Sequence, residues 1–252
     1  MNHLNGKNIT SIEELLSATG DRVNIMEEQI DVITQQNYTL LANFIQAHPD
    51  YERIRREFRE NMDELFGDTL EKEQKKRMLV ALADFAEPEV YRAIERFAAM
   101  NTPLKKWATV ALQQSRIKLQ TELLDDPGVF ISTGLGGQGS LLRFFAVFLY
   151  KAAKVEDFQL SLLKNETEAA IRNAGGKTEQ IKFLKSCTTV TMLMPLTVDL
   201  PDLMGTVLRE CNQFGNFLNE NMIITNVKKL TVKEIEYLKK KSPNRFNGIP
   251  RL

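Results

Sequence analysis

The chain has 252 residues, of which 43% are hydrophobic and 26% are charged, a balance that predicts a soluble globular protein rather than a disordered one. Its 33 basic residues equal its 33 acidic residues, so no net field draws nucleic acid or anionic lipid to the chain as a whole. The first residues do not show the basic segment followed by an apolar segment that marks a signal peptide, and no apolar run reaches the roughly 18 residues of a membrane span. We therefore expect a cytoplasmic location and no membrane contact.

Metal and acid–base chemistry have few candidate residues, because the chain holds only two cysteines and two histidines. Cys187, Cys211, His3 and His48 do not fall at the spacings of a zinc site. No serine or cysteine has an evident histidine base. We expect a non-enzymatic protein without metal or cofactor, in which both cysteines are reduced and buried.

The first half is predicted to be helical, because apolar residues recur at spacings of three and four over residues 11–124. Ser11 and Glu14 are a candidate capping box for a first helix. The pattern predicts a second helix over residues 24–46 and a charged amphipathic helix over residues 51–66. The helix over 24–46 is expected to bury one side, formed by Ile25, Ile30, Ile33, Leu40, Leu41, Phe44 and Ile45.

An internal repeat follows, since residues 75–82 (KKRMLVAL) and 105–112 (KKWATVAL) share Lys, Lys, Val, Ala and Leu at an offset of 30 residues. Such a period in helical sequence indicates stacked helix pairs. Pro88 begins one helix and Thr102-Pro103 precedes the next, while Phe85, Phe97 and Trp107 are expected in the core.

This segment resembles a HEAT-like repeat over about 50 residues, or about 80 with its poorer first unit. The residues that carry the likeness are Asp84, Pro88, Val90, Pro103, Ala108, Ala111 and Leu112. The resemblance implies a surface that binds other macromolecules and implies no catalysis. An unrelated helical bundle is the alternative.

The composition changes after the turn signal at residues 125–128, with more aromatic residues, threonines and glycines. We predict a helical domain over residues 1–126, an α+β domain over 127–238 and a basic tail over 239–252.

The second half alternates strand and helix. The predicted elements are a strand over 142–150, a helix over 156–173, hairpin strands over 177–185 and 188–196, a helix over 201–214, a strand over 221–227, and a final helix from Thr231 with Glu234 as its capping partner. The order βαββαβ is that of ferredoxin-like domains, in which an antiparallel sheet carries helices on one face. The predicted fold class is therefore α+β, with a helical first half and a ferredoxin-like second half.

RNA-recognition motifs share this order but need aromatic side chains on both central strands. The first strand has Phe144, Phe145 and Phe148, whereas residues 188–196 have none. We do not expect nucleic acid to bind the sheet, and the phenylalanines are predicted to pack beneath the helices. The basic run Lys239 to Lys241 complements the dipole of a helix C-terminus without nucleic acid.

The segment GLGGQGS, residues 134–140, resembles the dinucleotide fingerprint G-x-G-x-x-G and the GGxGS of adenylate-forming activating enzymes. A phosphate cradle needs a strand before the glycines and a helix after them. Residues 129–133 suit a strand, but residues 141–150 also suit a strand better than a helix. The alternatives are a glycine turn, a phosphate cradle and a loop that contacts a partner.

The sequence thus predicts an interaction or regulatory protein that binds another protein through its helical surface and the glycine-rich loop. The alternative is a nucleotide- or small-ligand-binding module. Its candidate ligand-binding residues are Ser132, Thr133, Gly134, Gly136, Gly137, Gly139, Ser140 and, as a phosphate contact, Arg143.

Overall fold

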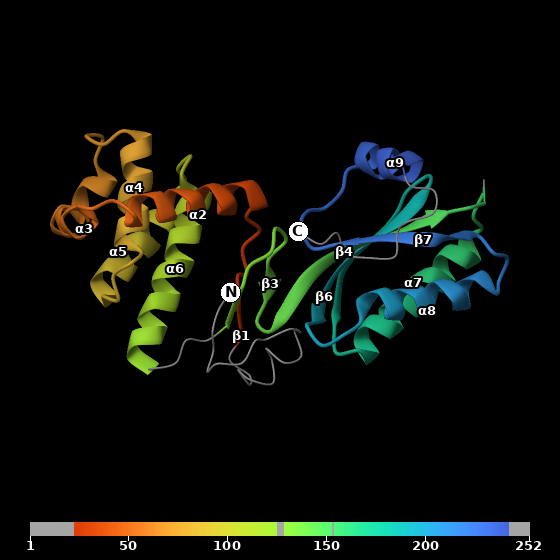
Figure 1. Cartoon of the computed structure of the whole chain (residues 1–252). Helices are drawn as coiled ribbons and strands as arrows, with labels where there is room; N and C mark the ends of the chain where they lie inside the picture. The colour runs from red at the N-terminus through yellow and green to blue at the C-terminus, as the bar shows by residue number, and fades with distance from the viewer. Residues whose placement is uncertain (1–22, 125–128, 153, 242–252) are drawn as a thin grey trace. The chain divides into compact units, whose positions relative to one another are not determined.

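A computed structural model of the chain describes residues 23–124, 129–152 and 154–241 (Figure 1). The chain divides into two compact units, which in the described residues are 23–131 and 132–241. The domain limits expected from the sequence remain a prediction. The candidate first helix at Ser11, the turn at 125–128 and the end of the basic tail lie outside the described residues.

The first unit is built from helices. They are α2 (Val32–Gln46), α3 (Tyr51–Glu60), the 3-10 helix η1 (Met62–Phe66), α4 (Lys72–Leu82), α5 (Pro88–Ala99) and α6 (Lys105–Leu124). A short strand, β1 (Val23–Ile25), precedes α2 and pairs in parallel with β2 (Val129–Ile131), which follows α6.

Two predicted helices differ from the observed ones at their ends. The helix expected from residue 24 begins at Val32, because the Asp31 carboxylate accepts a hydrogen bond from the backbone N–H of Thr34 at 2.9 Å and caps it, while residues 23–25 pair as a strand. The helix expected over 51–66 stops at Glu60, where the Asn61 side chain donates to the carbonyl of Glu57 at 2.9 Å and competes with the helical pattern.

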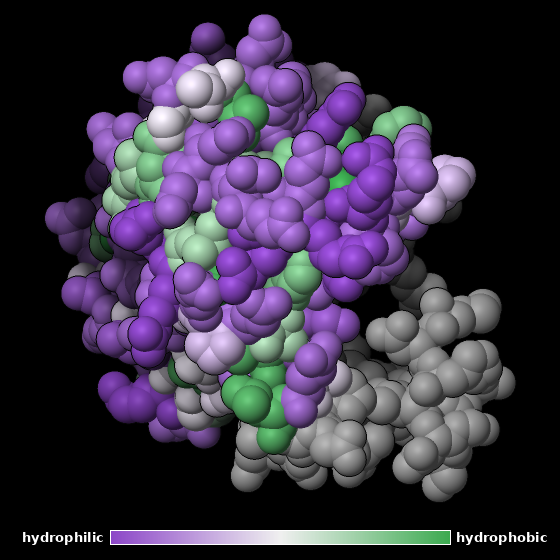
Figure 2. Space-filling view, turned by 90° about the vertical axis from the view of Figure 1, so that its left-hand side faces the viewer, coloured by the Kyte–Doolittle hydropathy of each residue, from purple (hydrophilic) through white to green (hydrophobic). Residues whose placement is uncertain are grey.

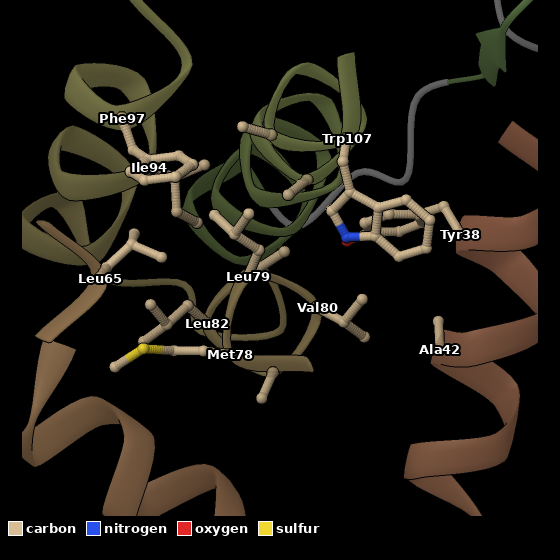
Figure 3. Close-up of a cluster of buried hydrophobic side chains, with 14 of the residues drawn as sticks. Tyr38, Ala42, Leu65, Met78, Leu79, Val80, Leu82, Ile94, Phe97 and Trp107 are labelled. Carbon is tan, nitrogen blue, oxygen red and sulfur yellow. The ribbon is translucent and has the colours of Figure 1, made fainter. Parts of the chain in front are cut away.

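The core of this unit is centred on α4, whose residues Met78 to Leu82 are all fully buried. Helices α2, α3 and α6 pack around α4, and Figure 3 shows Val80 of α4 facing Ala42 of α2. Trp107 of α6 lies in the same core with its indole ring against Tyr38 of α2, ring centroids 5.2 Å apart. The predicted burial of Trp107 and Phe97 is confirmed, whereas Phe85 is only half-buried against this core.

The second unit is an antiparallel sheet with helices. Its elements are β3 (Gly137–Gln138), β4 (Leu141–Tyr150), α7 (Asp157–Asn173), β5 (Lys177–Phe183), β6 (Cys187–Pro195), α8 (Leu200–Asn212), β7 (Leu218–Thr225) and α9 (Val232–Lys241). From β4 to β7 the order is βαββαβ, and the strands lie in the order β7-β4-β6-β5 with every neighbouring pair antiparallel. The predicted α+β class and ferredoxin-like sheet are confirmed.

Helices cover both faces of this sheet, whereas the sequence predicted one. Figure 1 shows α7 and α8 on one face and α9 on the other. Helix α9 places Ile235 against Phe145, Val147 and Leu149 of β4. Because side chains alternate along a strand, Phe144 and Phe148 lie on the α7–α8 face, so the phenylalanines are divided between two helical layers.

Both cysteines are buried, Cys187 in β6 and Cys211 in α8, as the sequence predicts. Burial raises the pKa of the Cys187 thiol and raises that of Cys211 to about 12, so both thiols stay protonated near neutral pH. Among the described residues, no helix combines the length and the apolar character that crossing a membrane takes.

Candidate functional site

The glycine-rich segment forms a β-hairpin. Strand β3 pairs with the start of β4, and Gly139 and Ser140 make the two-residue turn between them. Gly139 has φ +57°, at the first central position, where a type II′ hairpin turn requires a glycine. The element after the glycines is therefore the predicted strand, whereas a phosphate cradle has a helix at this place.

The inner part of the loop, Thr133 to Gly136, is packed against the chain that follows β7. The backbone N–H of Leu135 donates to the carbonyl of Asn226 at 3.0 Å, and that of Gly136 donates to the carbonyl of Thr133 at 3.2 Å. A Cβ at Gly134 would overlap the carbonyl oxygen of Val227, so this position requires glycine for close packing. Two of the amides that a phosphate would need are thus bonded within the protein.

Arg143, the candidate phosphate contact, is bonded to protein groups. Its Nε and Nη2 atoms donate to the two carboxylate oxygens of Glu179 on β5 at 2.6 and 2.8 Å, and its Nη1 donates to the carbonyl of Leu135 at 2.8 Å. This hydrogen-bonded pair lowers the pKa of the Glu179 carboxyl. Arg143 therefore fastens the glycine-rich loop to β5, and its charge is neutralised by Glu179.

The eight candidate residues divide into two groups. One group is buried within the second unit and comprises Gly134, Gly136 and Gly137. The other group is exposed and comprises Ser132, Gly139 and Ser140. Thr133 and Arg143 are half-buried between them, and the Thr133 hydroxyl donates to the carbonyl of Gly136 at 3.3 Å. The segment thus has a structural inner part and an exposed turn.

A second candidate surface lies on α2, where large apolar side chains point away from the core. Ile33, Leu40 and Phe44 are 69%, 66% and 70% exposed, while Tyr38, Ala42 and Ile45 on the other side are buried. At 3.6 residues per turn, positions 33, 37, 40 and 44 fall within an arc of about 60°. We call Ile33, Asn37, Leu40 and Phe44 the α2 outer face.

The expectation that Ile33, Leu40 and Phe44 belong to a single buried side of the helix is wrong, because all three are exposed. The helix has two apolar arcs, and the arc that packs against the core holds Tyr38, Leu41, Ala42 and Ile45. A helical wheel drawn from the sequence shows that the apolar residues of α2 fall into two groups, although it does not show which group packs against the core.

Helix α2 also carries no charged residue, although at the usual frequency a helix of 15 residues has about four. Helix α3, by contrast, has the charged sequence YERIRREFRE. In its last turn, Arg59 donates a hydrogen bond to the Glu87 carboxylate at 2.7 Å. Figure 2 shows one face of the helical unit, which is covered mostly by hydrophilic residues with hydrophobic ones in small separate groups. Interface centres are depleted of charge in the way that α2 is.

The orientation of α2 is fixed by specific contacts on its inner side. The Tyr38 hydroxyl donates to the side-chain oxygen of Gln114 on α6 at 2.8 Å. At the start of the helix, Lys106 of α6 donates to the Asp31 carboxylate at 2.9 Å, a contact that lowers the pKa of Asp31 to about 2. These bonds hold the helix with the outer face toward solvent.

No protein-family model matches the chain, and no curated protein matches it. In the described residues, no group of three or more His, Cys, Asp or Glu side chains is placed to hold a metal ion. The interpretation of function therefore depends on the chain's own geometry.

Proposed function

We propose that this chain is a non-enzymatic interaction protein of the cytoplasm that binds another protein through the α2 outer face. The observation that carries the proposal is the exposure of Ile33, Leu40 and Phe44 on a helix without charge. Water contact with large apolar side chains is unfavourable, and contiguous exposed apolar patches mark interaction sites on soluble proteins. A partner that covers this face removes that cost.

The proposal includes two HEAT-like helix pairs, α3 with α4 and α5 with α6. The internal repeat falls on α4 and α6, the second helix of each pair, and α2 packs against both of them. Helix pairs of this kind present surfaces for other macromolecules. In this chain α2 occupies the side formed by the second helices, which makes its outer face the exposed binding surface.

The exposed turn at Gly139 and Ser140 is a second, smaller contact in this proposal. The nucleotide alternative has less support, because the loop amides of Leu135 and Gly136 and the guanidinium of Arg143 are bonded within the protein. A ligand that binds only the folded state raises the unfolding midpoint. We expect no such shift with nucleotides, phosphate or metal ions.

The test compares the double variant Leu40→Glu, Phe44→Glu with a matched control, Thr39→Glu, Asn43→Glu. Both add two charges four residues apart on the exposed side of α2, but only the first pair lies on the outer face. Proteins captured on the immobilised wild-type chain are expected to be retained by the control and lost from the outer-face variant. Equal capture by both variants, each with native circular dichroism, contradicts the proposal.

A further inference from the structure

We propose that the partner of the α2 outer face is a second copy of this chain, and that two α2 helices pack in parallel about a two-fold axis. This inference rests on the proposed function, since it names the occupant of the same surface. It is argued from the charge, the spacing and the area of that surface.

The charge of α2 favours a copy of itself. Two identical faces meet without repulsion only where they carry no net charge, and α2 has no acidic or basic residue along its whole length. The exposed polar residues of α2 are the amides Gln36, Asn37, Asn43 and Gln46 and the hydroxyl of Thr39, and Asn37 is the amide that lies on the outer face. An amide is both donor and acceptor, so it pairs with its own copy, whereas two like charges cannot.

The spacing of the outer face is that of a short coiled-coil seam. Intervals of four, three and four residues place Ile33 and Leu40 at d positions and Asn37 and Phe44 at a positions of a heptad. In parallel pairs each a residue meets its own copy, and a single asparagine at an a position fixes the register of a dimer. Asn37 is therefore expected to face Asn37 of the second copy.

The area of the face predicts a weak, reversible dimer. The exposed parts of Ile33, Leu40 and Phe44 amount to roughly 400 Å² for each chain, within the size of functional patches on monomers. Two copies then bury roughly 800 Å² from these side chains, below the standard interface of about 1,600 Å². We expect a dissociation constant in the micromolar range.

Sedimentation equilibrium of the full chain from roughly 1 to 300 μM tests this directly. The wild type is expected to pass from monomer to dimer across that range. Leu40→Glu, Phe44→Glu is expected to weaken the dimer at least ~100-fold, because each substitution occurs twice in a symmetric interface. Thr39→Glu, Asn43→Glu is expected to stay within about threefold of the wild type, as peripheral residues do.

Cross-linking tests the parallel arrangement. Both native cysteines are buried, so a cysteine introduced on α2 is the accessible one. Under mild oxidation Asn37→Cys is expected to form a covalent dimer, because a and a′ residues are adjacent in a parallel pair, and Thr39→Cys is not. A cross-link at 39 with none at 37 overturns the geometry.

A wild type that stays monomeric at the highest concentration overturns the inference. If the chain then still captures another protein through the outer face, the proposed function holds without it. If neither self-association nor capture depends on Leu40 and Phe44, both fall together.

Discussion

The glycine-rich hairpin and the α2 outer face have opposite relations to their surroundings. In the hairpin, polar groups suited to a ligand are bonded within the protein, with Leu135 joined to Asn226 and Arg143 to Glu179. On α2, apolar side chains suited to a core are exposed to water. A binding surface is indicated by side chains that the fold leaves without packing partners, and of these two regions the α2 outer face is the one that exposes large apolar side chains.

Gly134→Val is expected to have the largest destabilising effect on the glycine-rich hairpin. The new side chain overlaps the backbone carbonyl of Val227, which cannot move without displacing the end of β7, so we expect a loss of about 3 kcal/mol in the free energy of unfolding. The matched change Gly139→Ala meets open space and costs only its positive φ, about 1 kcal/mol. Urea unfolding measures both, and equal losses contradict the structural role of Gly134.

Arg143→Met tests whether the loop is fastened to β5. The substitution leaves the Glu179 carboxylate and the Leu135 carbonyl without their donor in a site where the Arg143 and Glu179 side chains are 12% and 26% exposed. We expect a loss of about 2 kcal/mol. In a double-mutant cycle with Glu179→Gln, the two losses should be less than additive. Additive losses show that the pair does not couple.

The pH dependence of stability tests the same Arg143–Glu179 ion pair. The folded state lowers the pKa of Glu179 below its unfolded value of about 4.3, so its stabilising contribution is complete above that pH and is lost as the pH falls through the folded pKa. The stability difference between wild type and Glu179→Gln should be constant near neutral pH and shrink below about pH 4.5. A stability difference between wild type and Glu179→Gln that grows as the pH falls would contradict a lowered pKa of Glu179 in the folded state.

Neutral substitutions on the α2 outer face are expected to have the smallest effect on folding. Leu40→Gln should change the free energy of unfolding of the monomer by less than about 0.5 kcal/mol, because that side chain makes few native contacts. Leu79→Ala, in the fully buried α4, should cost about 3 kcal/mol. Urea unfolding at low protein concentration measures both values. A loss of stability in Leu40→Gln as large as that in Leu79→Ala would mean that Leu40 packs in the core.

Local patterns predicted most elements of the second unit. A continuous apolar run predicted β4, an alternating apolar pattern predicted β6, and the capping residue Thr231 predicted the start of α9. The side of the sheet covered by α9 could not be predicted, since it depends on Ile235 meeting one set of alternate β4 residues.

The inner and outer sides of α2 were also beyond local patterns. The side that packs is decided by contacts distant in sequence, namely Tyr38 with Trp107 and Gln114. Both arcs of the helix are apolar, so hydrophobicity alone does not distinguish them. Likewise, glycine spacing does not reveal that the Arg143 guanidinium lies against Glu179, which is 36 residues further along the chain.

Hydroxyl-radical footprinting of Phe44 tests directly whether the α2 outer face binds a partner, with buried Phe97 and exposed Phe214 as internal references. We predict that Phe44 is modified like Phe214 in the dilute chain and becomes protected when a partner covers the α2 outer face. Protection on concentrating the pure protein identifies a second copy, and protection only on adding cell extract identifies another protein. Modification of Phe44 at the level of Phe97 in the dilute chain, or no protection under either condition, contradicts the proposal that the α2 outer face is a binding surface.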